Sequence, residues 1–240
     1  MKEEELYQMI NEKERGLNMS IAFPALMRKV FLWMSLALII TAVTAYGVAT
    51  SPTLMTAIFT NKILFWGLVI AEFALVFSVT AAINRLSLAS ATLLFILYSI
   101  VNGATLSVIF YAFSMTVIVK TFAVTAGTFG VMALIGYTTK KDLTSIGKLL
   151  FMALIGLMIA TVVNAFVRSS GFDLIASYIG VIIFVGLTAW DTQKIKLMLS
   201  QAPDTSESYQ KMALMGALSL YLDFINLFLY LLRIFGNNRN

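Results

Sequence analysis

The chain has 240 residues, of which 60% are hydrophobic and only 12% are charged, with a net charge of +5 and a mean hydropathy of +0.89. Soluble globular domains carry roughly 25% charged residues, so this composition predicts an all-α integral membrane protein. The chain contains no cysteine and no histidine, which excludes disulfides, thiolate chemistry, Cys/His zinc sites and imidazole proton relays.

The first segment, residues 1–27, is polar and carries charges of both signs, among them Glu3, Lys13 and Arg15. It has no short apolar core followed by a cleavage site, so we expect no cleaved signal peptide. We predict that this segment is a polar N-terminal tail on the cytoplasmic side.

The rest of the chain is a succession of apolar runs, each close to the ~20 residues that cross a bilayer as a helix. Short connections with turn residues separate these runs, and Gln201 to Ser208 is the clearly polar loop among them. We predict seven transmembrane helices, approximately at 30–49, 63–83, 88–111, 117–137, 149–168, 174–193 and 211–233. They form one membrane domain over residues 28–236, because no connection is long enough for a soluble second domain.

The distribution of basic residues predicts the orientation of these helices. If the N-terminus is cytoplasmic, twelve of the 17 Lys and Arg residues fall on the cytoplasmic side, as the positive-inside rule requires. They lie at the ends of apolar runs, where they anchor helices, so the net positive charge does not indicate a nucleic-acid partner. The expected partner is the lipid bilayer of the inner or plasma membrane.

The first three predicted helices match the next three at an offset of 89 residues. Residues 67–71 then fall on 156–160, Phe95 falls on Phe184, and Asn102 falls on Asp191. Two units with an odd number of helices each would be inverted in topology, as in many transporters. Helices built from only a few apolar residue types also match by chance, so the similarity could be either a true repeat or a coincidence of composition.

Two aspartates lie within the last two apolar runs. A carboxylate in hydrocarbon costs at least ~2.5 kcal/mol on insertion scales, so it must be paired, protonated or wetted. Asp191 and Asp223 share a depth and can meet if the sixth helix continues to about Ser200 and the seventh begins near Ser208. Such a pair would hold a single proton near neutral pH and act as an acid sensor.

A structural explanation for Asp191 stays open beside this one. It could end its helix in the wetted headgroup region and pair there with Lys194 or Lys196.

Other polar residues within the apolar runs are candidates for the same site. Glu72 lies near the middle of the second predicted helix and needs a partner. Asn102 and Asn226 could supply amide contacts to an ion pathway, or could simply hydrogen-bond helices together. Arg85, at the cytoplasmic end of the second helix, lies at roughly the level predicted for Asp191. It could form a latch to that aspartate or serve as an ordinary positive-inside anchor.

The sequence does not favour an enzyme. Intramembrane aspartyl proteases carry their second aspartate in a Gly-x-Gly-Asp setting, whereas Tyr221 and Leu222 precede Asp223 here. Zinc-dependent seven-helix hydrolases need histidines. No Gly-rich phosphate loop or Gly-x-Ser-x-Gly elbow is present.

Two segments, Gly180 to Lys194 and Ser219 to Arg233, resemble the Bax inhibitor-1 family, also called the transmembrane Bax inhibitor motif family, in its bacterial branch. The similarity extends over residues 28–236. It implies two three-helix layers around a central seventh helix, and a pH-sensitive passive calcium leak. It also implies that Asp191 and Asp223 are the pH-sensing pair, that Arg85 latches the closed state, and that Glu72 is the acidic residue of the second helix.

We therefore predict a passive cation leak channel, for Ca²⁺ in particular, that Asp191, Asp223 and Arg85 gate. Carboxylates suit a hard cation, but Mg²⁺, Mn²⁺ or protons would use the same ligand type. We expect Ca²⁺ to bind only weakly and transiently, as a leak requires. The alternatives are proton-coupled transport and an interaction protein that modulates a membrane protease or a stress response through its N-terminal tail.

Overall fold

The structure is a computed structural model that describes residues 3–167 and 170–237. The described residues form helices and connections only. The helices are α1 (Glu3–Ala49), α2 (Pro52–Thr60), α3 (Lys62–Ala82), α4 (Leu88–Leu106), α5 (Ile109–Ala112), α6 (Met115–Thr138), α7 (Thr144–Val167), α8 (Ser170–Leu199) and α9 (Glu207–Asn237).

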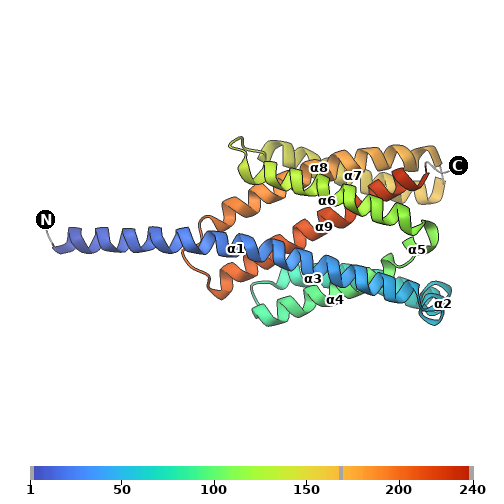
Figure 1. Ribbon diagram of the computed structural model, residues 1–240, viewed down its shortest axis with the longest axis horizontal. Coiled ribbons are helices and arrows are strands. Elements are labelled where there is room, and N and C mark those ends of the chain that lie inside the picture. The colour runs from blue at the N-terminus through green and yellow to red at the C-terminus, as the bar shows by residue number, and fades with distance from the viewer. Residues whose placement is uncertain (1–2, 168–169, 238–240) are drawn as a thin grey trace.

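Seven of these helices are long and apolar enough to cross a membrane, as predicted. Their apolar stretches are 21–49, 62–82, 88–112, 115–138, 144–164, 171–199 and 207–236. The first begins nine residues earlier than the predicted start at residue 30, because α1 is one helix of 47 residues that includes most of the polar segment 1–27. The N-terminal part of α1 projects beyond the other helices (Figure 1).

The first short helix, α2, lies in a connection that the sequence analysis treated as a turn. The second, α5, falls at the end of the predicted third helix, 88–111, which the structure divides into α4 and α5. The start of α2 has clear local causes: the Ser51 side chain accepts a hydrogen bond from the Leu54 amide at 3.4 Å, and Pro52 occupies the first turn. Both are established signals for a helix N-terminus. The segment between the first two spans is therefore a short helix followed by a second capped start at Asn61.

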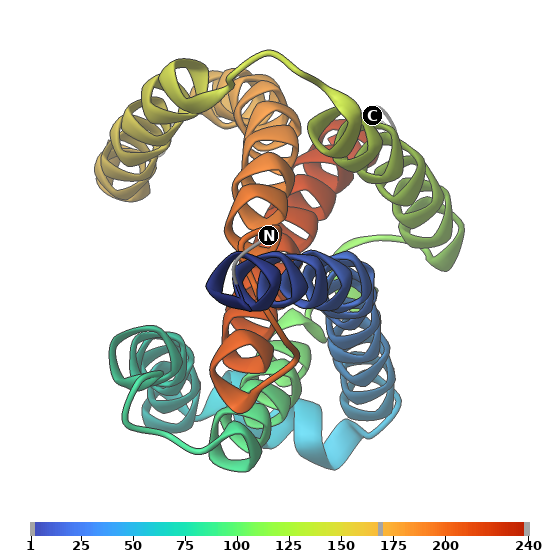
Figure 2. The ribbon, with the colours of Figure 1, turned by 90° about the vertical axis from the view of Figure 1, so that its left-hand side faces the viewer.

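The seven long helices form two groups of three with α9 between them (Figure 2). In one group α4 packs against α1 and α3, and in the other α8 packs against α6 and α7. Helix α9 contacts α1, α4, α6 and α8. This arrangement confirms the predicted layers around a central seventh helix. The two groups also have the same order of contacts, as the 89-residue repeat implies.

Burial follows this arrangement. The side chains of α9 are largely enclosed, and Leu214, Leu220 and Tyr221 are fully buried. The outer helices instead expose large apolar side chains, such as Phe77 on α3 and Ile159 on α7. Exposed apolar faces on the outside and an enclosed central helix are what a lipid-embedded bundle requires.

Within each group, glycines allow two helices to approach closely. A Cβ atom on Gly103 of α4 would lie 2.6 Å from the carbonyl oxygen of Thr41 on α1. A Cβ atom on Gly136 of α6 would overlap the carbonyl oxygen of Ala189 on α8. Small residues at such contacts are typical of helix packing in membranes, and here they fix the depth of α4 and α8 relative to their neighbours.

Candidate functional site

The two aspartates lie on α8 and α9, which pack along each other. Helix α8 ends at Leu199 and α9 begins at Glu207. The prediction that Asp191 and Asp223 can meet required α8 to end near Ser200 and α9 to begin near Ser208. Both observed limits lie within one residue of these positions. The loop between them is held by Asp204, whose carboxylate accepts a hydrogen bond from the Ser206 amide at 2.9 Å.

Asp223 is buried in the centre of the bundle. Its side chain is 5% exposed, and its Oδ2 atom has no hydrogen-bond partner in the part of the chain that the structure describes. Asp191, half-buried on α8, lies close enough to act electrostatically on Asp223. The structure thus brings the two predicted carboxylates into one site.

Lys194 is the basic side chain that acts on Asp191. Lys194 lies three residues further along α8, and its Nζ lies over the Trp190 ring at 5.3 Å from the centroid. No ion pair joins Lys194 to Asp191 among the described residues, so the pairing that the sequence left as the structural explanation is not formed, although Lys194 lies close enough to act electrostatically on Asp191. The site contains two carboxylates and one ammonium group.

Arg85 is not part of this group. It is exposed in the turn between α3 and α4, and no ion pair joins it to either aspartate among the described residues. That turn is attached to the start of α9 instead: Glu207 accepts a hydrogen bond from the Leu88 amide at 2.7 Å, and Lys211 donates one to the Leu86 carbonyl at 3.0 Å. The predicted latch is not formed in this arrangement of the helices.

A second polar group surrounds Tyr221, on the other face of α9. The Tyr221 hydroxyl donates to Asn102 Oδ1 of α4 at 3.1 Å and lies 2.6 Å from Thr41 Oγ1 of α1. The Thr41 hydroxyl also donates to the Ser99 carbonyl at 3.0 Å. This group joins three helices through buried hydrogen bonds. The sequence analysis identified Asn102 but missed Thr41 and Tyr221.

Glu72 belongs to this same side of the molecule. The Thr105 hydroxyl of α4 donates a hydrogen bond to a Glu72 carboxylate oxygen. Glu72 is half-buried and acts electrostatically on Tyr98 and Tyr221. The acidic residue predicted on the second span thus has a hydroxyl partner, in the half of the bundle that does not contain Asp191.

Asn226, one turn after Asp223, does not join either group through its amide hydrogen bond. Its Nδ2 donates to the Leu222 carbonyl of its own helix at 2.8 Å. Its predicted place in a polar network stays a prediction.

The described residues contain no cluster of three or more carboxylates that could hold a metal ion. Ca²⁺ takes six to eight oxygen ligands, so Asp191 and Asp223 would leave most of its coordination to water and backbone carbonyls.

Two further aspartates lie outside the membrane-spanning segments. Hydrogen bonds from Thr144 lower the pKa of Asp142 below its ordinary value, and the hydrogen bond from the Ser206 amide does the same to the pKa of Asp204. Both carboxylates therefore remain ionised between pH 5 and 8. A response to pH in that range has to come from other groups.

Known proteins are similar to this chain over nearly its whole length. Residues 24–240 match the family model described as "Inhibitor of apoptosis-promoting Bax1". The inner membrane protein YbhL of Escherichia coli is 51% identical over 215 residues, which cover 89% of this chain and 92% of YbhL. A protein of Borreliella burgdorferi is 48% identical over 88% of this chain and 91% of its own length. A protein of Rickettsia prowazekii is 41% identical over 89% of this chain and 90% of its own length. The chain belongs to the Bax inhibitor-1 family of multi-pass membrane proteins.

Proposed function

We propose that this protein is a pH-sensitive passive cation channel, with Ca²⁺ as its main permeant ion, and that the protonation state of Asp191 and Asp223 gates it. The observation that carries the proposal is the buried Asp223 carboxylate, which has an oxygen without a hydrogen-bond partner among the described residues and has Asp191 within electrostatic range. A carboxylate is rarely placed in the hydrocarbon core without a functional reason.

The position of the pair suggests how gating would work. Two ionised carboxylates repel each other, and one shared proton removes that repulsion. Because α9 contacts four other spans, a change in its separation from α8 would alter the packing of both halves. The proton thus favours one of two arrangements of the bundle. It can shift the equilibrium between these arrangements only to the extent that it binds one of them more tightly than the other.

Calcium flux into proteoliposomes tests this proposal. Flux is measured from pH 5 to 8 for the parent protein, Asp191→Asn and Asp223→Asn. We expect both substitutions to flatten the pH dependence. Asp142→Asn and Asp204→Asn serve as matched controls, because these carboxylates stay ionised throughout this range. Identical pH profiles in all five proteins would rule out gating by the pair.

We also propose an inner-membrane location with a cytoplasmic N-terminus. The relative YbhL is named an inner membrane protein, which supports the location. The distribution of basic residues supports the orientation. The chain has no cysteine, so single cysteines introduced at Lys140 and Lys62 report the two sides directly. A membrane-impermeant thiol reagent applied from outside the inner membrane should label position 62 and not position 140.

A second candidate function is that of an interaction protein acting on membrane partners such as a protease. The projection of the N-terminal part of α1 beyond the bundle favours it (Figure 1), because this segment would be accessible to a partner. Deletion of residues 1–20, which lie before the first apolar stretch, separates the two functions. A channel should keep its flux in proteoliposomes, whereas an adaptor should lose its effect in cells.

A further inference from the structure

A groove of about 750 Å³ lies between α1 and α6, two helices from different halves of the bundle. Both helices pack against α9, which lies between and behind them (Figure 1). Phe224 of α9 contributes to the lining, and its ring makes a tilted contact with Phe122 and an edge-on contact with Phe129 of α6, each with ring centroids 5.5 Å away. The groove is therefore a seam between the halves with an aromatic floor.

The groove exists because α6 presents small residues along this seam. Ala126, Gly130 and Ala133 line it, and a Cβ atom on Gly130 would have no atom within 4 Å. Larger side chains at these positions would close the gap. Most of the other lining residues are apolar, and none is acidic. Water has few hydrogen-bond partners on such a surface, so an apolar occupant is favoured.

The length of the groove matches one leaflet of a bilayer. Its lining on α1 runs from Pro24 and Arg28 to Ala42. From Arg28 to Ala42 the helix rises ~21 Å, close to the ~20 to 22 Å that one leaflet spans when its headgroup region is included. The groove thus extends from headgroup depth to about the middle of the membrane, as an acyl chain does.

Positive charge gathers at the headgroup end. Arg28 lines the groove there, and its guanidinium has no hydrogen bond or ion pair in the described part of the chain. Tyr137 lines the same end, and Lys196 donates a hydrogen bond to its carbonyl at 2.7 Å while lying 5.4 Å from its ring centroid. An anionic group at this mouth would meet two basic side chains.

We propose that this groove binds one anionic phospholipid from the surrounding bilayer, in the leaflet on the side of the N-terminus. Its phosphate lies at Arg28, and an acyl chain runs along the seam and packs on Phe224. The lipid then fills the space between the two halves of the bundle. This site is independent of the proposed channel activity, since it requires only the groove and its basic mouth.

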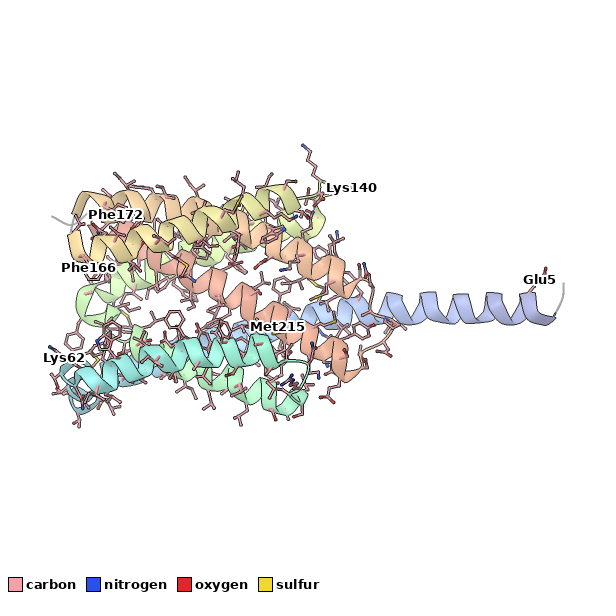
Figure 3. The ribbon with its side chains drawn as sticks, turned by 180° about the vertical axis from the view of Figure 1, so that it is seen from behind. Glu5, Lys62, Lys140, Phe166, Phe172 and Met215 are labelled. Carbon is pink, nitrogen blue, oxygen red and sulfur yellow. The ribbon has the colours of Figure 1, made fainter. Side chains whose placement is uncertain are left out.

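Native mass spectrometry of the detergent-purified protein tests the site, with phosphatidylglycerol as the anionic probe and phosphatidylethanolamine as its zwitterionic counterpart. We expect the parent to retain one phosphatidylglycerol in preference to phosphatidylethanolamine. Arg28→Ala should reduce that preference roughly fivefold, the effect of one basic residue near an anionic membrane surface. Arg28→Lys should preserve the preference. Lys140→Ala is the matched control, because Lys140 is on the same side of the membrane but extends away from the bundle (Figure 3).

Filling the groove gives a second, independent test. Gly130→Leu should lower retention of both lipids, because its side chain occupies the space of the acyl chain. Gly127→Leu is the matched control: Gly127 is on the same helix, also has open space at its Cβ position, and does not line the groove. If Gly130→Leu does not fold, Ala126→Leu takes its place. Equal retention of the two lipids by the parent, or undiminished retention in the filled variant, overturns the proposal.

Discussion

Tyr221 and Asp223 lie two residues apart on α9 and face opposite halves of the bundle. Tyr221 reaches Thr41 and Asn102 in the first half, whereas Asp223 interacts with Asp191 in the second. Residues at i and i+2 of a helix point in nearly opposite directions, so one helical turn supplies both contacts. Helix α9 therefore connects a hydrogen-bonded polar group on one side with a charged pair on the other.

The Tyr221 group should contribute measurably to stability. Tyr221→Phe removes the hydroxyl contacts to Thr41 and Asn102 and keeps the aromatic ring. Hydrogen bonds within membranes average ~0.6 kcal/mol, so we expect a loss of about 1 kcal/mol and a midpoint of thermal unfolding lower by about 2 to 4 °C. Unfolding in detergent, followed by circular dichroism, measures it. The control is Tyr230→Phe, since the Tyr230 hydroxyl makes no hydrogen bond among the described residues. An equal midpoint for parent and Tyr221→Phe would contradict the expectation.

The close approach of α1 and α4 at Gly103 predicts a strong size limit there. In Gly103→Ala the new methyl group would lie 2.6 Å from a backbone oxygen and 2.8 Å from the Thr44 Cβ, so the helices must separate. Overpacking of this kind costs about 1 to 3 kcal/mol. Gly127→Ala has open space and gains helix propensity, so its stability should equal or exceed that of the parent. The midpoint of thermal unfolding should therefore fall in Gly103→Ala and should not fall in Gly127→Ala, and a parent-like Gly103→Ala would refute the packing argument.

Glu72 is predicted to serve ion passage rather than pH sensing. Glu72→Gln preserves the hydrogen bond from Thr105 and removes the charge that would attract a cation. We expect lower calcium flux at every pH in proteoliposomes, with an unchanged shape of the pH profile. Thr105→Val is a useful companion, because it removes the partner and leaves the carboxylate. A flattened pH profile in Glu72→Gln would assign Glu72 to the sensor instead.

Arg85 and Lys194 are rival basic partners for Asp191. If Arg85 latches the closed state, that state requires a movement of the α3–α4 turn, because Arg85 is exposed and unpaired with either aspartate here. We predict that Arg85→Ala raises the basal leak at neutral pH, whereas Lys194→Ala moves the midpoint of the pH profile, since Lys194 acts directly on Asp191. Flux from pH 5 to 8 distinguishes them. An unchanged basal leak in Arg85→Ala would remove the latch from the mechanism.

The loop between α8 and α9 should loosen in acid. The hydrogen bond from the Ser206 amide lowers the pKa of Asp204 below its ordinary value of 3.8. A group with a lowered pKa in the folded state stabilises the fold at neutral pH, and this contribution is lost as pH falls through that pKa. Hydrogen exchange at the Ser206 amide, corrected for intrinsic rates, should therefore accelerate below about pH 4. Asp204→Asn should abolish this dependence, and Asp142→Asn should leave it intact.

Much of the candidate site could be predicted because Asp191 and Asp223 are conspicuous in their setting. A carboxylate within an apolar run is a local feature, and so are the chain positions at which α8 and α9 end. The Tyr221 group could not be found in the same way. Tyrosine, threonine and serine are common in membrane helices, and nothing in the residues around Thr41 indicates that its hydroxyl meets a tyrosine 180 residues later.

Arg85 shows the same limit of prediction from sequence, here for a contact that was predicted but is not formed. Its position along the second span agrees with the level of Asp191, but agreement in depth does not determine which helices are neighbours. The structure shows that α3 packs on α4, while α8 packs on α6, α7 and α9. The distance between Arg85 and Asp191 therefore depends on the lateral arrangement of the bundle.

The sequence by itself determined the number of spans, their approximate limits, the absence of cysteine and histidine chemistry and the two acidic positions in the last spans. These depend on composition and on runs of neighbouring residues. Only the tertiary structure decided which face of each helix meets which neighbour, and hence the Tyr221 group, the separation of Arg85 from Asp191 and the groove between α1 and α6. The physical reason is that these helices are apolar on nearly every side, so their rotation about their own axes is set by close packing at residues such as Gly103 and Gly136 rather than by a hydrophobic pattern.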